Sequence, residues 1–116
     1  MTNFSHGRAA EAAATEYLKK QGFKVLAQNW RTRYCEIDVV AGKDKVVYFV
    51  EVKYRQSGDQ GSGLEYITPK KLKQMELAAR FWVSDNDWHG DFRLAAVEVG
   101  GTDYEVTNFL SSVKDY

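Results

Sequence analysis

The segment of residues 46–54, which reads VVYFVEVKY, places the strongest constraint on the fold. Apolar side chains from Val46 to Val52 occur at both odd and even positions, which is typical of a strand covered on both faces. A sheet is covered on both faces only by further layers, so the run favours an α/β domain with helices packed against a central sheet. Glu51 and Lys53 interrupt this run, and charges on such a strand are costly unless they have partners.

The flanking segments predict two helices and four further strands. An alanine-rich stretch with Ser5 as N-cap and Gly22 at its far end predicts a helix over 5–21. Thr68, followed by the single proline, predicts a second helix over 68–84 with apolar residues at helical spacing. The strands are expected at residues 23–30, 34–41, 46–54, 91–99 and 104–107. A C-terminal helical turn should follow. The order α-β-β-β-α-β-β predicts an α/β fold with a mixed central β-sheet flanked by helices.

Composition bounds the size and surroundings of this fold. The chain has 116 residues, 44% of them hydrophobic, so a single domain over 1–116 is expected. The apolar runs fall far short of the roughly 20 residues of a membrane-spanning helix. One cysteine and no secretory signal favour a cytoplasmic protein without membrane contact. The net charge is +0, but residues 1–80 carry 14 Lys/Arg against 9 Asp/Glu, so a basic face is possible.

Two carboxylates and an ammonium are predicted to converge on one face of the sheet. Glu51 and Lys53 lie two residues apart in one strand and therefore share a face. If the preceding hairpin has a loop of two or four residues, Asp38 lies opposite or diagonal to Glu51, within roughly 5–8 Å. A three-residue loop would turn Asp38 to the other face. The loop length therefore decides whether the cluster forms.

Such a cluster suits hydrolysis of phosphodiester bonds with Mg²⁺ or Mn²⁺. Carboxylate oxygens hold the ion, which stabilises the pentavalent charge and acidifies a water molecule that a lysine helps to position. Glu11, on an apolar stripe of the first helix, would be a further member, because a carboxylate there needs a partner. Glu36 shares the parity of Asp38 and is either a ligand, a supporting residue or a surface carboxylate. The plain alternative is a cross-strand ion pair of Glu51 with Lys53.

Basic and aromatic residues near the strand ends indicate a nucleic-acid contact. The candidates for phosphate contacts are Arg31, Arg33, Arg55, Lys70 and Lys71. Trp30, Tyr34, Trp82 and Trp88 could stack on unpaired bases, although tryptophans in small domains usually belong to the core. The glycine-rich segment 55–63 is expected to be a loop that contributes to the choice of substrate. An ordinary charged surface remains the default explanation for any one of these basic residues.

Several ordered motifs together resemble the YraN-like family of small uncharacterised bacterial proteins. The motifs are Gly7-Arg8-Ala9-Ala10-Glu11, Asn29-Trp30-Arg31, Glu36-Ile37-Asp38-Val39-Val40-Ala41, Phe49-Val50-Glu51-Val52-Lys53-Tyr54-Arg55 and Ile67-Thr68-Pro69-Lys70-Lys71. The resemblance covers roughly residues 6–110. Ala10 and Cys35 replace glycines that are usual in the family, and Cys35 adds bulk near the expected site.

That family is similar to the PD-(D/E)xK nucleases and to archaeal Holliday-junction resolvases, which have a restriction-endonuclease-like fold. The resemblance implies that Glu11, Asp38 and Glu51 bind a divalent metal, that Lys53 assists the nucleophilic water and that Glu36 supports the site. The expected function is a metal-dependent nuclease acting on branched or single-stranded DNA. The alternative is a module of the same fold that binds nucleic acid or protein without turnover. A homodimer would suit a symmetric substrate.

Overall fold

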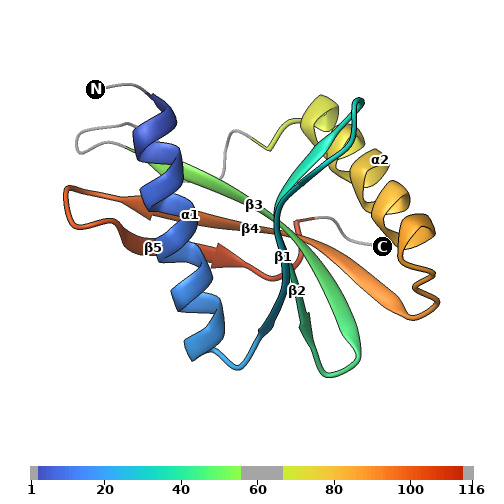
Figure 1. The fold of residues 1–116 in the computed structure, drawn as a ribbon. Coiled ribbons are helices and arrows are strands. Elements are labelled where there is room, and N and C mark those ends of the chain that lie inside the picture. The colour runs from blue at the N-terminus through green and yellow to red at the C-terminus, as the bar shows by residue number, and fades with distance from the viewer. Residues whose placement is uncertain (1–2, 56–66, 114–116) are drawn as a thin grey trace.

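The computed structural model describes residues 3–55 and 67–113, and the side chains from residue 7 onward within them. Two helices and five strands follow one another in the predicted order α-β-β-β-α-β-β (Figure 1). They are α1 (Asn3–Lys20), β1 (Lys24–Arg31), β2 (Glu36–Lys43), β3 (Val46–Arg55), α2 (Pro69–Asp85), β4 (Asp91–Gly100) and β5 (Glu105–Leu110). None of the helices in these ranges is long and apolar enough to cross a membrane.

The five strands form one mixed sheet in the order β1-β2-β3-β4-β5. Antiparallel pairing joins β1 to β2, β2 to β3 and β4 to β5, whereas β3 and β4 are parallel. A parallel pair needs a long crossover connection, and the chain between β3 and β4 contains α2. This arrangement confirms the expected fold class, a mixed central sheet flanked by helices.

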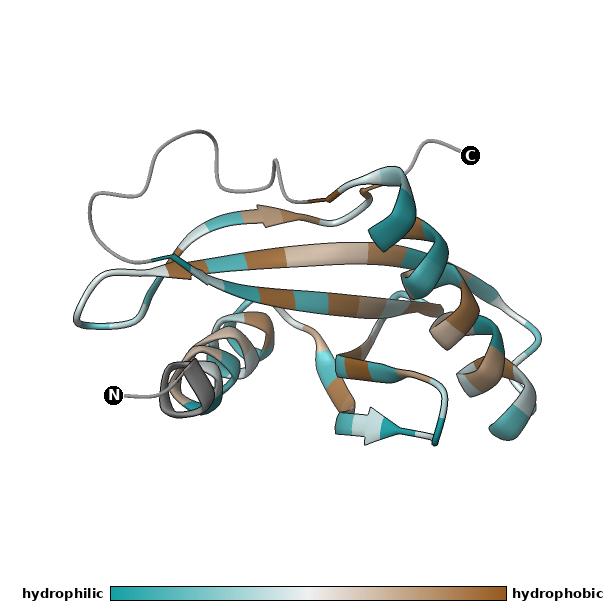
Figure 2. Ribbon diagram, turned by 90° about the horizontal axis from the view of Figure 1, so that it is seen from above, coloured by the Kyte–Doolittle hydropathy of each residue, from teal (hydrophilic) through white to brown (hydrophobic). Residues whose placement is uncertain are grey.

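Strand β3 is covered on both faces, as its apolar run predicts. Val50 packs into a core cluster with Ala14 and Leu18 of α1, on one face of the sheet. Phe49 packs into a second cluster with Met75 and Trp82 of α2, on the opposite face. Figure 2 shows hydrophobic residues along the central strands, interrupted by hydrophilic segments. The sheet therefore separates two apolar cores, each closed by one helix.

The hairpin between β2 and β3 has the two-residue loop that brings Asp38 beside Glu51. Lys43 pairs with Val46, which leaves Asp44 and Lys45 as the loop. Both loop residues have positive φ, 52° and 67°, as the tight turn that matches the twist of antiparallel strands requires. Of the three loop lengths considered above, the structure has the shortest.

Three local expectations were wrong. Helix α1 begins at Asn3, so Ser5 lies inside the helix rather than at its N-cap. Strand β5 runs to Leu110 because its pairing with β4 continues as far as Ala96, so residues 108–110 extend the strand. Residues 111–113 form no helical turn, and Val113 instead donates a backbone hydrogen bond to Leu94 in β4. Most of the expected loop, residues 56–63, lies outside the described residues.

Gly22 ends α1 in the left-handed conformation that its position predicts. Its φ is 93°, and the N–H groups of Gly22 and Phe23 donate to the carbonyls of Lys19 and Leu18, as in a Schellman motif. Only three residues, 21–23, therefore connect α1 to β1. This turn places the start of the sheet against the apolar face of the helix.

Gly22→Ala should lower the free energy of unfolding by about 1 kcal/mol, because a side chain disfavours the left-handed backbone. An added Cβ would meet the Lys43 side chain at an ordinary 3.6 Å, so the cost is that of the backbone alone. Gly7→Ala is the matched control inside α1, where a Cβ meets nothing within 4 Å, and it should stabilise by about 0.5 kcal/mol. Urea denaturation measures both, and effects of the same sign would contradict the assignment.

Candidate functional site

Asp38 lies where β2 and β3 separate. The described pairing of the two strands ends at Val39 with Val50, so Asp38 and Glu51 are the next residues along this register. Beyond that point the Val52 N–H donates a 2.8 Å hydrogen bond to Oδ2 of Asp38. The carboxylate thus takes over an acceptor role where the ladder ends. The sequence prediction that Asp38 lies beside Glu51 is confirmed.

Asn29 occupies the corresponding position on the other side of Asp38. The pairs Gln28 with Val39 and Trp30 with Ile37 leave Asn29 and Asp38 opposite each other in β1 and β2. Asn29 has a φ of 51°, a left-handed conformation that asparagine tolerates better than most residues. Such backbone conformations cost energy and often occur at functional sites.

The side chains of β1 and β2 change from one face of the sheet to the other where Asn29 lies opposite Asp38. Val40 and Ile37, three residues apart in β2, both pack into the core cluster on the α2 side, which regular alternation would not allow. Ala27 and Trp30 in β1 repeat this spacing and pack against the same cluster. The two strands therefore share one irregularity, centred on Asn29 and Asp38. The outer ends of β1 and β2 turn toward α2 beyond it (Figure 1).

The surroundings of Asp38 disfavour its charged form. Burial raises the pKa of Asp38 to about 7, with a further contribution from the negative charge of Glu51. The hydrogen bond from Val52 lowers the pKa, while the charges of Glu11 and Glu36 raise it. All four predicted carboxylates are therefore close enough to interact electrostatically, and together they form an acidic cluster that favours a cation.

Glu11 reaches this acidic cluster from α1. Burial raises the pKa of the Glu11 carboxyl, and the charges of Glu36 and Glu51 act in the same direction. The Asn29 side-chain amide opposes the shift through a hydrogen bond to this carboxylate, and so does the charge of Arg31. Asn29 was not predicted as a site residue. Its signal in the sequence was a turn-forming residue within a segment that otherwise reads as a strand.

The cation beside Glu51 comes from α2. Nζ of Lys71 lies 3.0 Å from Oε2 of Glu51, and both side chains are partly buried. Lys71 was expected to contact phosphate, whereas Lys53 was expected to lie beside Glu51. Lys53 is exposed, two residues farther along β3. The structure therefore places two lysines near Glu51, one on the sheet and one on the helix.

The other predicted basic residues have varied surroundings. Arg31 forms an exposed ion pair with Glu36 at 3.6 Å, and Arg55 forms a more buried one with Glu98 at 3.5 Å. Lys70 is exposed in the first turn of α2. The Arg33 guanidinium lies over the ring of Tyr34. Arg31 and Lys71 thus contact carboxylates of the acidic cluster, whereas Arg55 pairs with Glu98 in β4.

The donor chemistry of the acidic cluster fits a hard divalent cation. Carboxylate oxygens are the usual protein ligands of Mg²⁺, which keeps several water molecules and commonly takes only one or two carboxylates. Within residues 3–55 and 67–113, no three acidic, histidine or cysteine side chains already converge closely enough to hold a metal ion together. A site of the Mg²⁺ kind would therefore use Asp38 with Glu51 or Glu11 and complete its shell with water.

The fold and this cluster define a small mixed α/β protein with acidic residues at the separation of two central strands. The chain belongs to the Uncharacterised protein family UPF0102, whose model matches residues 10–99. A UPF0102 protein of Sulfurihydrogenibium sp. is 40% identical over 102 residues, covering 87% of this chain and 89% of the relative. One of Thermotoga maritima is 42% identical over 96 residues, covering 79% and 83%. The expected family of small uncharacterised proteins is confirmed.

Asp38→Asn should change how stability depends on pH. The folded wild type keeps the Asp38 proton up to about pH 7, whereas the ordinary value of 3.8 applies to the unfolded chain. The contribution of this group to stability is therefore present below about pH 4 and is lost as the pH rises to about 7. The variant keeps an acceptor oxygen for Val52 but does not titrate. Its stability relative to wild type should increase by about 2–4 kcal/mol over this interval and stay constant above it.

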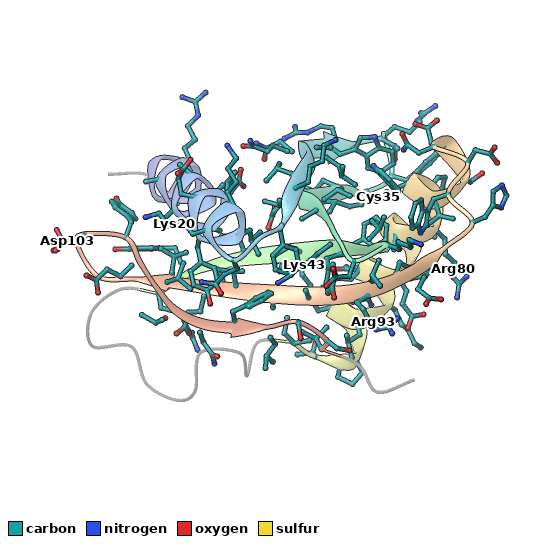
Figure 3. All side chains as sticks on the ribbon, turned by 90° about the horizontal axis from the view of Figure 1, so that it is seen from below. Lys20, Cys35, Lys43, Arg80, Arg93 and Asp103 are labelled. Carbon is teal, nitrogen blue, oxygen red and sulfur yellow. The ribbon has the colours of Figure 1, made fainter. Side chains whose placement is uncertain are left out.

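Urea denaturation at a series of pH values measures this difference. Asp103→Asn, in the β4–β5 turn at the far end of the molecule (Figure 3), controls for the loss of one negative charge. A difference between Asp38→Asn and wild type that does not vary with pH would show that the fold leaves the Asp38 carboxyl in an ordinary environment.

Proposed function

We propose that the protein is a metal-dependent nuclease that hydrolyses phosphodiester bonds in branched or single-stranded DNA. The observation that carries the proposal is the state of Asp38, a partly buried carboxylate that accepts a hydrogen bond from Val52 and interacts with three other carboxylates. An acidic cluster of this kind is unfavourable alone and is stabilised by a divalent cation. The resemblance to PD-(D/E)xK nucleases supports the same chemistry.

Each residue of the cluster has a role in this proposal. Asp38, Glu51 and Glu11 would hold Mg²⁺ or Mn²⁺, and a bound ion supplies charge stabilisation and an acidified water molecule. The Val52 N–H fixes the orientation of the Asp38 carboxylate, and the Asn29 amide does the same for Glu11. Lys53 would position the attacking water, while Glu36 and its partner Arg31 border the site.

The ion pair of Glu51 with Lys71 favours one alternative. It supplies Glu51 with a protein cation, which is what a module without turnover would need to keep the cluster stable. Such a module would bind nucleic acid through its basic residues, or bind a protein partner, without cleaving anything. The nuclease proposal includes DNA as the partner and a homodimer that acts on symmetric branched substrates.

Cleavage assays separate the two functions. Wild-type protein with Mn²⁺ or Mg²⁺ should cut at least one of four substrates: single-stranded, linear duplex, flapped or four-way DNA. Asp38→Asn and Glu51→Gln should reduce the cleavage rate about 100-fold or more, because each removes a carboxylate that would hold the metal ion. Glu16→Gln, on the exposed face of α1, is the matched control and should cut like wild type. Cleavage that persists unchanged in Asp38→Asn would refute the assigned site.

The two lysines near Glu51 can be assigned by a matched pair of variants. Lys53→Met should lower the cleavage rate by about 10²-fold or more while DNA affinity stays close to wild type, as for a residue that positions the water. Lys71→Met should instead weaken DNA binding and change the rate less. The reverse result would transfer the catalytic role to Lys71. Affinity is measured by fluorescence anisotropy in EDTA, and the rate is measured with saturating protein.

Metal binding should be linked to proton release. Asp38 must lose its proton to act as a ligand, so the affinity for Mn²⁺ should rise as the pH passes about 7 and level off above it. Calorimetry in two buffers of different ionisation enthalpy, with and without a short duplex, measures the protons released. Asp38→Asn should abolish the binding. Wild-type protein that binds no metal even with DNA would favour the module without turnover.

A further inference from the structure

An exposed aromatic residue lies beside the acidic cluster, in the connection between β1 and β2. Tyr34 is 69% exposed, the highest value among the large hydrophobic residues that the structure describes as exposed. The Thr32 hydroxyl accepts hydrogen bonds from the N–H groups of Tyr34 and Cys35, and the Thr32 N–H donates to the Cys35 carbonyl. These bonds define the conformation of the connection. The exposed position of Tyr34 is therefore defined by a hydrogen-bonded turn.

The Tyr34 ring belongs to a stack. It lies 6.2 Å from the ring of Phe81 on α2, with 20° between the ring planes, and Phe81 is itself 38% exposed. The Arg33 guanidinium lies 5.4 Å from the centre of the Tyr34 ring. A planar, cationic group thus already lies over this ring, and an incoming base would take the place of this group.

A hollow connects Tyr34 to the acidic cluster. It has a volume of about 280 Å³, and its lining includes Tyr34, Glu36, Glu51 and Lys71. Cys35, labelled in Figure 3, lines it as well, between β1 and β2 on the α2 side. A second hollow of about 250 Å³, lined by Trp30, Arg31 and Phe81, lies at the same stack. A flat group on the stack would thus have a polar, charged cavity beside it.

We propose that Tyr34 and Phe81 form a stacking platform for an unpaired base of a DNA strand. The inference rests on the proposed function and names the part of the substrate that it would recognise. Stacking on an exposed aromatic ring accepts any base, because every base has a π face. Arg33 and Lys71 supply positive charge for the adjoining phosphates. A base in a duplex is already stacked on both sides, so the platform selects single-stranded or flapped DNA.

The chemistry of the surface favours a nucleotide over an apolar peptide. The hollow beside Tyr34 is lined by Lys71 and Gln74, which suit a phosphate and a sugar hydroxyl. Its other lining residues include Glu36, Glu51, Met75 and Leu77. The aromatic surface consists of the Tyr34–Phe81 pair, with Trp30 at the adjoining hollow. A base with its attached phosphate matches both parts of this surface.

Binding without metal tests the platform separately from cleavage. The probe is a fluorescein-labelled oligothymidylate of about 12 nucleotides, titrated in EDTA and followed by anisotropy. Tyr34→Ala should raise its Kd about 5- to 100-fold, which corresponds to the loss of one stacked base. Tyr34→Phe should keep the Kd within about twofold of wild type, since the ring is retained. A blunt duplex of matched length should bind both variants and wild type alike.

An abasic oligonucleotide of the same length isolates the role of the base. It keeps the phosphates, so wild type and Tyr34→Ala should bind it with equal Kd. Leu110→Ala removes an exposed apolar side chain from β5 and is the matched control, expected to bind oligothymidylate like wild type. Circular dichroism confirms that each variant is folded.

Three results would overturn the platform. They are wild-type protein that does not bind oligothymidylate, Tyr34→Ala that binds it as tightly as wild type, and an equal loss on single strand, duplex and abasic strand. The last would mean that Tyr34 acts through the fold or through phosphate. Cleavage that is lost in Asp38→Asn but unaffected in Tyr34→Ala, with unchanged binding, would refute the platform and leave the nuclease proposal standing. Base-dependent binding without cleavage would refute the nuclease proposal and leave the platform standing.

Discussion

Strand β3 must be covered on both faces, and the rest of the structure follows from this requirement. Helix α1 covers one face of the sheet and α2 covers the other. Because α2 lies in the connection between β3 and β4, that connection is long enough to return to the starting edge, and the two strands run parallel. Glu51 sits in this covered strand. Its charge is tolerated because the neighbouring strand separates at Asp38 and because α2 brings Lys71 to it. The same packing that builds the core therefore concentrates charge at one place.

The elements that sequence reasoning predicted well are those controlled by local chemistry. The apolar run of β3, the Thr68 N-cap of α2 and the left-handed Gly22 each act within a few residues. Position within a strand then predicted that Asp38 and Glu51 would adjoin, provided that the loop was short. The sequence left three loop lengths open. Asp44 and Lys45 both adopt positive φ, which residues other than glycine seldom do, and this choice could not be read from their identity alone.

The features that sequence reasoning missed depend on contacts between distant segments. Strand alternation predicts one face for each side chain, but the shared irregularity at Asn29 and Asp38 reverses that alternation in two strands at once. Lys71 pairs with Glu51 from α2, 20 residues farther along the chain, and sequence reasoning did not predict this pair. The position of Lys71 depends on the packing of Met75 and Trp82 of α2 against the sheet. No local pattern carries that information.

Lys71 links the acidic cluster to the proposed binding surface. It pairs with Glu51 and lines the same hollow as Tyr34, so one ammonium group faces both a carboxylate and the space where a phosphate would lie. A metal ion bound to Glu51 would repel the nearby Lys71 ammonium, because like charges repel. On the proposed function, Lys71 would therefore give up Glu51 to the metal ion and turn to the phosphate of the stacked nucleotide. Metal and single-stranded DNA would then each strengthen the binding of the other, as reciprocal coupling between two sites requires.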